Sequence, residues 1–468
     1  MLQMKKQESK LALRKKKKDE KKRLLELLKA KQLKDVWFNA RVGVHLVRKG
    51  SVIVPDKGYL KSLEYPFKIF FDEKHDMREA ISDLDARIKH ERSIQYHGPV
   101  AGQKAGALLE CSGSEWLVTE SPPYIEPIAG NWPHLKDLIE SLLPNPIAQA
   151  ALFSWCQTQY IAVRDGRHSQ CPMLIFAGGA GDGKTLLLNL ITAIRGGREI
   201  NPIKAWSGEG PVWNDHLLGC ECLNIDDSVA LKNYQARQNL ATSIKEAIFA
   251  NSVTIDKRNN TSFTLQPRPV WGVAMAVNAN SDSIKTVPAL DGADMADKAT
   301  VLRTHRAKIL FREQGDEAAE KRYKAYKDEL PAFVNWLLRE FKKPKDLPEG
   351  CFAGRSGTLV YRDPEALTEL HRVTPAGLLE EVLLDFYEKT VIHKNSASGG
   401  LGTKEEPIDT ANLLGYLRDE YEKDRRVPDA VQTAGKYLTQ IAARPNSCIE
   451  EAGENRNHSK LWVFKAPD

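Results

Sequence analysis

Residues 173–191 read MLIFAGGAGDGKTLLLNLI, and this stretch decides the fold. The apolar run from Met173 to Ala177 predicts a buried strand, and the apolar run after Lys184 predicts a helix. The segment between them fits the pattern G-x-x-x-x-G-K-[ST] in the strand–loop–helix context that this pattern requires. That segment consists of Gly178, Gly179, Ala180, Gly181, Asp182, Gly183, Lys184 and Thr185.

A loop of this kind binds phosphate for defined physical reasons. Glycines let the backbone wrap around an anion with its N–H groups pointing inward, and the helix N-terminus adds positive potential. We expect Lys184 to neutralise the β- and γ-phosphates and Thr185 to bind Mg²⁺ through its hydroxyl group. An ordinary glycine-rich turn would need all of these features to coincide. The sequence therefore predicts a site for ATP and Mg²⁺.

A second apolar segment ends in two acids. Cys220 to Ile225 predicts a strand, and Asp226 and Asp227 follow it directly. We expect Asp226 to hold Mg²⁺ through water and Asp227 to orient or deprotonate the attacking water. A plain turn is the alternative interpretation of an Asp-Asp pair. The preceding strand and the phosphate-binding loop favour the catalytic role.

A third apolar segment, Val270 to Val277, predicts a strand that ends at Asn278. An amide at that position can sense the γ-phosphate and position water, although it can also simply cap the strand. We expect the three strands to lie side by side in one sheet. That arrangement would bring Lys184, the acid pair and Asn278 around one triphosphate, and it predicts an α/β fold for this part of the chain.

The positive charge of the chain is concentrated at its beginning. The whole chain of 468 residues carries a formal net charge of +6, whereas residues 1–35 hold 14 Lys/Arg and 5 Asp/Glu, a charge of +9, which leaves −3 for the rest. Residues 11–33 predict a helix, and such a basic arm can bind nucleic acid by neutralising phosphates. A solvated helix is the alternative. Its apolar stripe consists of Leu24, Leu25, Leu27, Leu28 and Leu33.

Composition argues against several classes of protein. No apolar run approaches the roughly 20 residues of a membrane-spanning helix, and the start of the chain has no apolar stretch suited to secretion. The seven cysteines form no C-x-x-C pair, which argues against a zinc module and a disulfide framework and indicates a reducing, cytoplasmic setting. Asp83 and Asp85 have the spacing of a metal-binding pair, but alternate residues of a helix diverge, so we expect a solvated helix face.

Patterns outside the core predict further elements. We expect short strands in residues 36–75, including FKIFF at 67–71, a helix at 77–90 and two helices in 132–163. Residues 342–350 are expected to form a linker. The resulting domains are a basic helical arm (1–35), an α+β region of unknown role (36–130), a helical lead-in (131–170), an ATPase domain (171–345) and a C-terminal domain (355–468).

The C-terminal domain is expected to be winged-helix-like. Three amphipathic segments between residues 374 and 444 predict helices, and two short strands around a polar turn follow them. The same pattern serves DNA binding and protein–protein contact, and both remain open. The candidate contact residues are Lys436, Gln440 and Arg444 on the third helix and Arg456, His458 and Lys460 on the wing.

The order and compact spacing of the three motifs resemble those of superfamily 3 helicases, a branch of the AAA+ proteins found in viruses, phages and mobile elements. The similarity is greatest to the helicase part of phage and plasmid primase-helicases, and it covers residues 133–311. It implies a P-loop (AAA+-like) core and a ring, usually a hexamer, with ATP sites between subunits. The chain has no recognisable primase or origin-binding endonuclease domain, so a separate primase or polymerase is an expected partner.

The resemblance also implies a DNA-binding hairpin between the second and third strands. Residues 252–266 contain two short strand patterns around a turn that carries Lys257 and Arg258, and Lys245 lies on the predicted helix before them. Two cations on a moving loop can grip the phosphates of single-stranded DNA without reading its sequence.

An ATP site between subunits requires a cation from the neighbouring subunit. Arg306 fits the family best because it precedes an apolar stretch that ends at Phe311, Arg303 is the second candidate, and Lys298 is the third. The chain departs from the family in the long segment between Asn278 and Arg306, which leaves this assignment open.

Together these features predict an ATP-dependent DNA helicase that acts in the replication of a phage or other mobile element in a bacterial host cell. It would translocate as a ring on single-stranded or forked DNA. One alternative is a P-loop ATPase that loads or remodels a protein partner. Another is a DNA-binding replication initiator, in which the basic arm and the C-terminal domain matter more than translocation.

Overall fold

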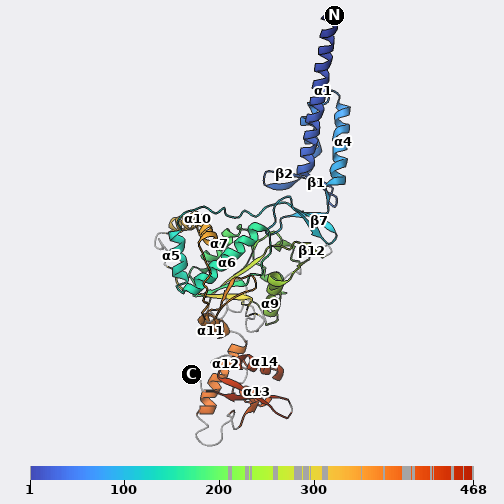
Figure 1. Ribbon diagram of the computed structural model, residues 1–468. Helices are drawn as coiled ribbons and strands as arrows, with labels where there is room; N and C mark the ends of the chain where they lie inside the picture. Colours follow the sequence, from blue (N-terminus) through green and yellow to red (C-terminus); the bar gives the residue numbers. More distant parts are fainter. Residues whose placement is uncertain are drawn as a thin grey trace.

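The protein is extended along one axis, with a long helix at one end, an α/β body in the middle and a small unit at the other end (Figure 1). In this computed structural model, the described residues are 2–208, 213–226, 231, 234–256, 262–278, 287, 295, 297–307, 315–348, 350–372, 375–392, 402, 406–421, 424, 426–443, 447–456 and 458–465.

A five-stranded sheet forms the centre of the body, with the order β14-β8-β13-β10-β9. All four pairings are parallel. The central strands are continuous apolar runs because both of their faces are covered, as is usual in parallel sheets. The strands are β8 (Met173–Gly178), β9 (Glu199–Ile200), β10 (Cys222–Ile225), β13 (Gly272–Asn278) and β14 (Ala299–Thr304).

Two hydrophobic cores cover the two faces of this sheet. Even-numbered strand residues, such as Phe176 and Ala276, pack against one layer of helices, whereas odd-numbered residues, such as Ile175 and Met275, face the other layer. The first layer contains α5 (Pro133–Leu142), α6 (Pro146–Asp165), α7 (Lys184–Ile194) and α10 (Gly315–Arg339). The second layer contains α8 (Ile203–Trp206), η1 (Asp215–Leu217) and α9 (Tyr234–Phe249).

The N-terminal region begins with α1 (Leu2–Asp35), which leads into a four-stranded sheet of order β3-β2-β1-β4. The strand expected at 67–71 is absent; residues of this segment belong to a short helix instead, and Phe67 is fully buried in the local core. Asp85 accepts hydrogen bonds from His45 and Lys89, consistent with a structural carboxylate. The elements are β1 (Val36–Asn39), β2 (Val44–Lys49), β3 (Val52–Asp56), α2 (Tyr59–Ser62), α3 (Glu64–Lys68), α4 (Lys74–Glu91) and β4 (Ser93–Ile94).

A second five-stranded sheet joins the N-terminal region to the body. Its order is β11-β12-β6-β7-β5, and Leu265 of the body pairs with Cys111 of the N-terminal region. Residues 36–130 therefore share a sheet with residues 254–266. The strands are β5 (Tyr96–Gly98), β6 (Leu108–Cys111), β7 (Ser114–Val118), β11 (Thr254–Ile255) and β12 (Phe263–Gln266).

The C-terminal unit has its own core and begins near residue 375. Three preceding elements pack on the body instead, since Leu359 and Leu370 belong to its two cores. These elements are β15 (Cys351–Ala353), β16 (Leu359–Tyr361) and α11 (Pro364–Arg372). The unit itself contains α12 (Pro375–Phe386), the π-helical turn η4 (Tyr387–Ile392), β17 (Ile408–Asp409), α13 (Thr410–Glu420), α14 (Val431–Ala442), β18 (Ile449–Glu454) and β19 (Lys460–Phe464).

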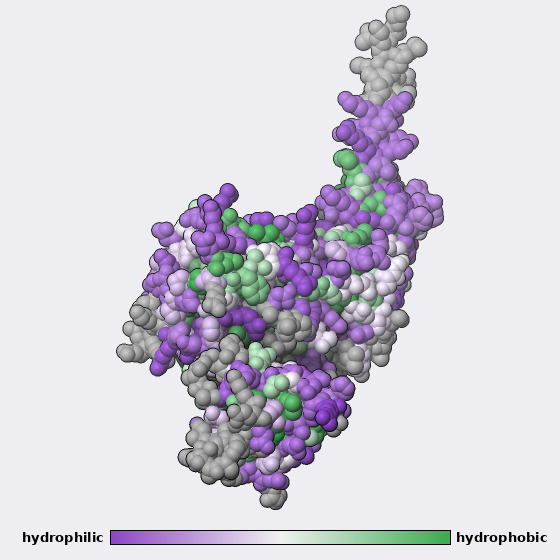
Figure 2. All heavy atoms as spheres, turned by 60° about the horizontal axis from the view of Figure 1, so that its bottom comes forward, coloured by the Kyte–Doolittle hydropathy of each residue, from purple (hydrophilic) through white to green (hydrophobic). Residues whose placement is uncertain are grey.

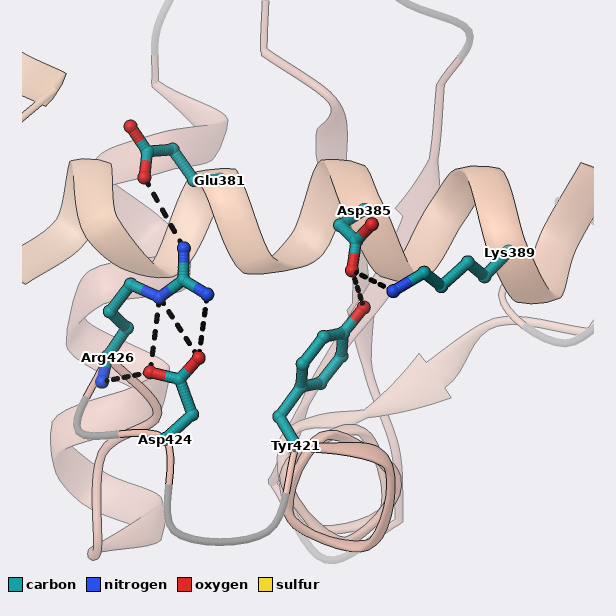
Figure 3. A network of polar contacts seen from close by, with 6 residues as sticks. All are labelled: Glu381, Asp385, Lys389, Tyr421, Asp424 and Arg426. Carbon is teal, nitrogen blue, oxygen red and sulfur yellow. Dashed lines mark hydrogen bonds and ion pairs between the residues drawn. The ribbon is translucent and has the colours of Figure 1, made fainter.

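Polar contacts hold α12 against the segment that follows α13 (Figure 3). Asp385 accepts hydrogen bonds from Lys389 at 2.7 Å and from the Tyr421 hydroxyl at 2.6 Å. Arg426 binds Asp424 at 2.7 Å and reaches Glu381 at 3.5 Å. These groups lie at the surface, so each pair contributes little by itself and the apolar core carries the stability of the unit.

Among the described residues, no helix is both long enough and apolar enough to span a membrane. All seven cysteines are free thiols, and six of them are buried.

Candidate functional site

The glycine-rich loop connects β8 to α7 at the carboxyl edge of the central sheet. Gly181 and Gly183 have φ angles of 78° and 112°, which side chains other than glycine rarely adopt. A methyl group on Gly178 would approach the carbonyl oxygen of Thr304 to 2.6 Å. Larger residues are therefore excluded from this loop by backbone conformation at two positions and by close packing at a third.

Lys184, the first residue of α7, points back across the loop. Its side chain is 6% exposed, and its ammonium group donates to the carbonyl oxygens of Gly178 at 3.2 Å and Gly179 at 2.6 Å. It also donates to Oδ1 of Asn278 at 2.8 Å. Two residues singled out from separate sequence motifs are thus in direct contact.

The register of the sheet explains this contact. Asn278 is opposite Gly178 at the ends of the neighbouring strands β13 and β8. Both are even-numbered positions on the face of the sheet that packs against α7. The N-terminus of α7 therefore lies next to the end of β13.

Asp226 follows β10 on this same face. Asn224, two residues earlier, donates to Thr192 of α7 at 2.8 Å, which places the even-numbered side chains of β10 on the α7 side. The Asp226 carboxylate is exposed at the carboxyl edge of the sheet. Its neighbour Asp227 lies outside the described residues. Of the two acids, Asp226 therefore has a defined position on the lysine face.

The sequence alone did not identify two further polar residues at this edge. Asn201 follows β9 and donates to Oδ1 of Asp226 at 2.9 Å. Thr304 ends β14 and donates to the carbonyl oxygen of Ala177 at 3.2 Å. Both repeat the pattern that singled out Asn278, a polar residue where a strand ends. Four of the five strands, β9, β10, β13 and β14, thus end at or just before a polar side chain, and β8 leads into the glycine-rich loop.

The three candidate cations occupy different places. Arg303 lies within β14 and forms an ion pair with Glu365 of α11. Lys298 lies at the opposite edge of the sheet, just before β14, and its ammonium group is 3.9 Å from a carboxylate oxygen of Asp297. Arg306 is exposed and follows the end of β14. β14 ends before Arg306, and the apolar strand expected after Arg306, which would end at Phe311, lies outside the described residues from residue 308 on.

Arg306 lies close to the loop of its own subunit. The residue before it, His305, donates its N–H to Leu142 at 2.9 Å, and the residue after it, Ala307, donates its N–H to Asp182 at 3.0 Å. Arg306 also lines a cavity of about 560 Å³ between α5 and α10. The other lining residues are His134, Asp137, Leu138, Glu140, Ser141, Pro144 and Tyr326.

The two strands of the expected hairpin are present. β11 and β12 pair in antiparallel fashion, and Lys245 lies on α9, which leads into them. Lys257 and Arg258 lie outside the described residues. Phe263 of β12 packs against Tyr96 and Trp116, with ring centroids 5.7 and 5.4 Å away, and those two rings stack on each other at 5.8 Å. The base of the hairpin is therefore fixed to the N-terminal region.

The C-terminal candidates divide between a helix and a turn. Lys436 is exposed and Gln440 half-buried on α14, and Arg444 lies outside the described residues. Around the turn between β18 and β19, Lys460 pairs with Glu451 at 2.6 Å and His458 lies 3.4 Å from Glu454. Lys460 and His458 of the wing thus lie beside acidic side chains, whereas Arg456 is exposed.

Comparisons with known proteins show a shared fold. No protein-family model and no curated protein matches the sequence. Two solved apo structures of the C-terminal region of NrS-1 each match with a TM-score of 0.52, at 11% and 12% identity, and cover 92% of this chain and 96% of theirs. A structure titled SCCmec type IV Cch, an active helicase, matches with a TM-score of 0.36 and 11% identity over 92% of each chain, which is too low to bear on the fold.

Proposed function

We propose that this protein is an ATP-driven DNA helicase that acts in the replication of a phage or other mobile element. The observation that carries this proposal is the contact between Lys184 and Asn278 on the sheet edge that also holds Asp226. A lysine, an amide and a carboxylate on one face of a parallel sheet, beside a glycine-rich loop and a helix N-terminus, can together serve one triphosphate. The fold shared with the NrS-1 C-terminal region is consistent with it.

Each group has a chemical task in this proposal. The loop binds the phosphates with its N–H groups, and Lys184 neutralises the β- and γ-phosphates. Thr185 and Asp226 would hold Mg²⁺, which prefers hard oxygen ligands: Thr185 through its hydroxyl group and Asp226 through a bridging water, with the carboxylate held in place by Asn201. When bound, Mg²⁺ offsets the charge that develops on the phosphates. Asp227 and Asn278 orient the attacking water.

The cavity beside the loop suits the nucleoside part of ATP. Leu142 and Ala307, the chain neighbours of the lining residues Ser141 and Arg306, both lie against Gly183 of the loop. Tyr326 offers an aromatic ring and Arg306 a cation for the ribose or the phosphates. A volume of about 560 Å³ falls within the range of small-molecule sites.

Single-stranded DNA is the proposed track. Lys257 and Arg258 would grip its phosphates from the hairpin, and a ring of subunits would pass the strand from one hairpin to the next. The base of this hairpin, β11 and β12, is fixed on the N-terminal sheet.

ATP hydrolysis measured with and without single-stranded DNA tests the proposal. We expect DNA to stimulate the rate, and Lys184→Ala to abolish hydrolysis in both conditions. Lys61→Ala, which changes an exposed lysine on α2, is the matched control and should behave as the unmodified protein. Hydrolysis that persists in Lys184→Ala overturns the site. Hydrolysis that ignores DNA but responds to a protein partner would instead support a remodelling ATPase.

A further inference from the structure

Helix α1 leaves the body as a single rod. Its 34 residues extend about 50 Å at 1.5 Å per residue. Figure 1 shows α4 beside only the lower half of this rod. The base is anchored, because Leu25, Leu28 and Leu33 pack on the N-terminal core and Gln32 accepts a hydrogen bond from the Tyr59 hydroxyl at 3.2 Å. The part before residue 24 projects beyond this anchor.

The projecting part is densely basic. Residues 14–23 read RKKKKDEKKR, eight cations and two acids, a net charge of +6. All of these side chains are exposed except Lys21, which is half-buried. Within the part of the arm whose side chains the structure describes, the only ion pair of this segment is Lys21 with Asp72 at 3.7 Å. On the face drawn in Figure 2, the coloured part of the arm is hydrophilic, and hydrophobic residues lie near its base.

The cations surround the helix and do not form one face. Successive residues turn by 100°, so the five cations from Arg14 to Lys18 encircle the rod completely. A helix with cations on one side fits a single phosphate backbone. A helix with cations on all sides fits between two backbones, and the major groove of B-DNA, about 12 Å wide, accepts a helix of about 10–12 Å diameter.

We propose that residues 14–23 bind double-stranded DNA through its phosphates, without reading its sequence, and so hold the duplex outside the motor. Six of the eight cations are lysine, and lysine is a point charge without the planar fork that reads guanine. This binding does not require ATP and is therefore separate from the proposed helicase activity.

The same observations argue against a lipid surface. A helix that lies in a membrane interface presents large apolar side chains on one face. Residues 14–23 contain none, and among the arm residues whose side chains the structure describes, the exposed leucines, Leu24 and Leu27, lie outside this segment.

The test uses the full-length protein without nucleotide and a labelled 30-base-pair duplex, with affinity measured by fluorescence anisotropy at several salt concentrations. The variant changes Lys15, Lys16, Lys17 and Lys18 to Gln. We expect roughly tenfold or greater loss of duplex affinity and a fall of about 3–4 in the slope of log K against log salt. The matched control changes four exposed lysines of the body, Lys104, Lys204, Lys324 and Lys345, to Gln and should retain the slope.

Three outcomes overturn the proposal. The first is an unchanged salt slope in the arm variant. The second is an equal loss in the control variant, which would show a general charge effect. The third is an altered oligomeric state with unchanged duplex affinity, which would make the arm a contact between subunits. The proposal is supported if the arm variant loses duplex affinity but retains its affinity for single-stranded DNA and its ATP hydrolysis. That result leaves the helicase proposal unaffected.

Discussion

Asn278 connects the end of β13 to the lysine of the loop, and its role can be separated from that of a strand cap. We predict that Asn278→Ala lowers kcat for ATP hydrolysis by about 10²-fold, because a positioned donor or acceptor at a reacting phosphate contributes on this scale. Nucleotide affinity should change only a few-fold, since the backbone N–H groups of the loop remain. Steady-state hydrolysis and equilibrium binding of a fluorescent nucleotide measure the two quantities.

The conservative variant Asn278→Asp distinguishes the two roles. It keeps an oxygen acceptor for Lys184, 2.8 Å away in the unmodified protein, but removes the amide donor. Full activity in this variant would mean that the amide only holds the lysine, and full activity in Asn278→Ala would remove Asn278 from the site.

Residue positions were predictable from the sequence where a long apolar strand precedes them. Asn278 is the last residue of a seven-residue strand, and the apolar pattern before it marks the end of that strand. Asn201 was not predictable from the sequence, because β9 has only two residues and contains no apolar run. The pairing of Arg303 with Glu365 depends on how α11 packs against β14, which local patterns do not record.

At the scale of elements, the end of α9 is secured by side chains from other segments. His168 donates from Nε2 to the carbonyl oxygen of Ile248 at 2.8 Å, and Gln170 donates to that of Phe249 at 3.2 Å. Arg268 donates to the carbonyl oxygens of Ala247 and Ala250. These bonds satisfy carbonyls that a helix end leaves unpaired, directly before the hairpin begins.

His168 makes this end of the helix sensitive to acid. Burial and the nearby Arg268 cation lower the pKa of His168 from 6.5 to about 4. Between pH 6.5 and pH 4 the unfolded chain therefore binds a proton at His168 that the folded protein does not bind. The contribution of His168 to the free energy of unfolding is full above pH 6.5 and is lost as the pH falls below that value. We predict a loss of about 2 kcal/mol at pH 5 relative to pH 7.5 from this group alone.

Comparison with His168→Gln isolates that contribution, because glutamine can keep the donor but does not titrate. Denaturant unfolding at pH 7.5 and pH 5 should show a smaller acid-induced loss in the variant than in the unmodified protein. Equal losses in both proteins would show that His168 titrates normally in the fold.

The second element to test is the aromatic contact that fixes the hairpin base. Phe263 is 4% exposed and packs against Trp116 and Tyr96. We predict that Phe263→Ala costs about 3–5 kcal/mol of stability and weakens the stimulation of hydrolysis by DNA. Ile69→Ala, at a position 71% exposed, is the control and should stay within about 0.5 kcal/mol. Unaltered DNA stimulation in a folded Phe263→Ala protein would show that the hairpin does not depend on this support.

Element type was predictable where the pattern was long and wrong where it was short. The two helices in 132–163 have long apolar patterns, and each begins with proline. The apolar run at 67–71 predicts a strand, but Phe67 lies on α3, which ends at Lys68, and the ring of Phe71 beyond the helix stacks on it with ring centroids 6.4 Å apart. A short apolar run does not distinguish a strand from a buried helix.

At the scale of the whole molecule, the arm, the body and the C-terminal unit follow one another along the axis in Figure 1. The sequence indicated this order, but it did not indicate that β12 completes a sheet with β6 and β7, because pairing between distant segments depends on three-dimensional contacts. It also placed the start of the C-terminal domain at 355, whereas the separate core begins near 375. Residues 351–372 carry apolar side chains that the body buries.

The assembly of subunits raises the question of which ATP site Arg306 serves. The family resemblance implies a neighbouring site, whereas the hydrogen bonds of His305 and Ala307 hold Arg306 beside the loop of its own subunit. Mixing two inactive variants, Lys184→Ala and Arg306→Ala, decides between them. If Arg306 acts on the neighbour, about a quarter of the interfaces in a random ring would combine intact Lys184 and intact Arg306, and hydrolysis would return. We predict that the mixture stays inactive, because no subunit then holds both Lys184 and Arg306. As a control, a mixture of unmodified and Lys184→Ala subunits verifies that subunits exchange.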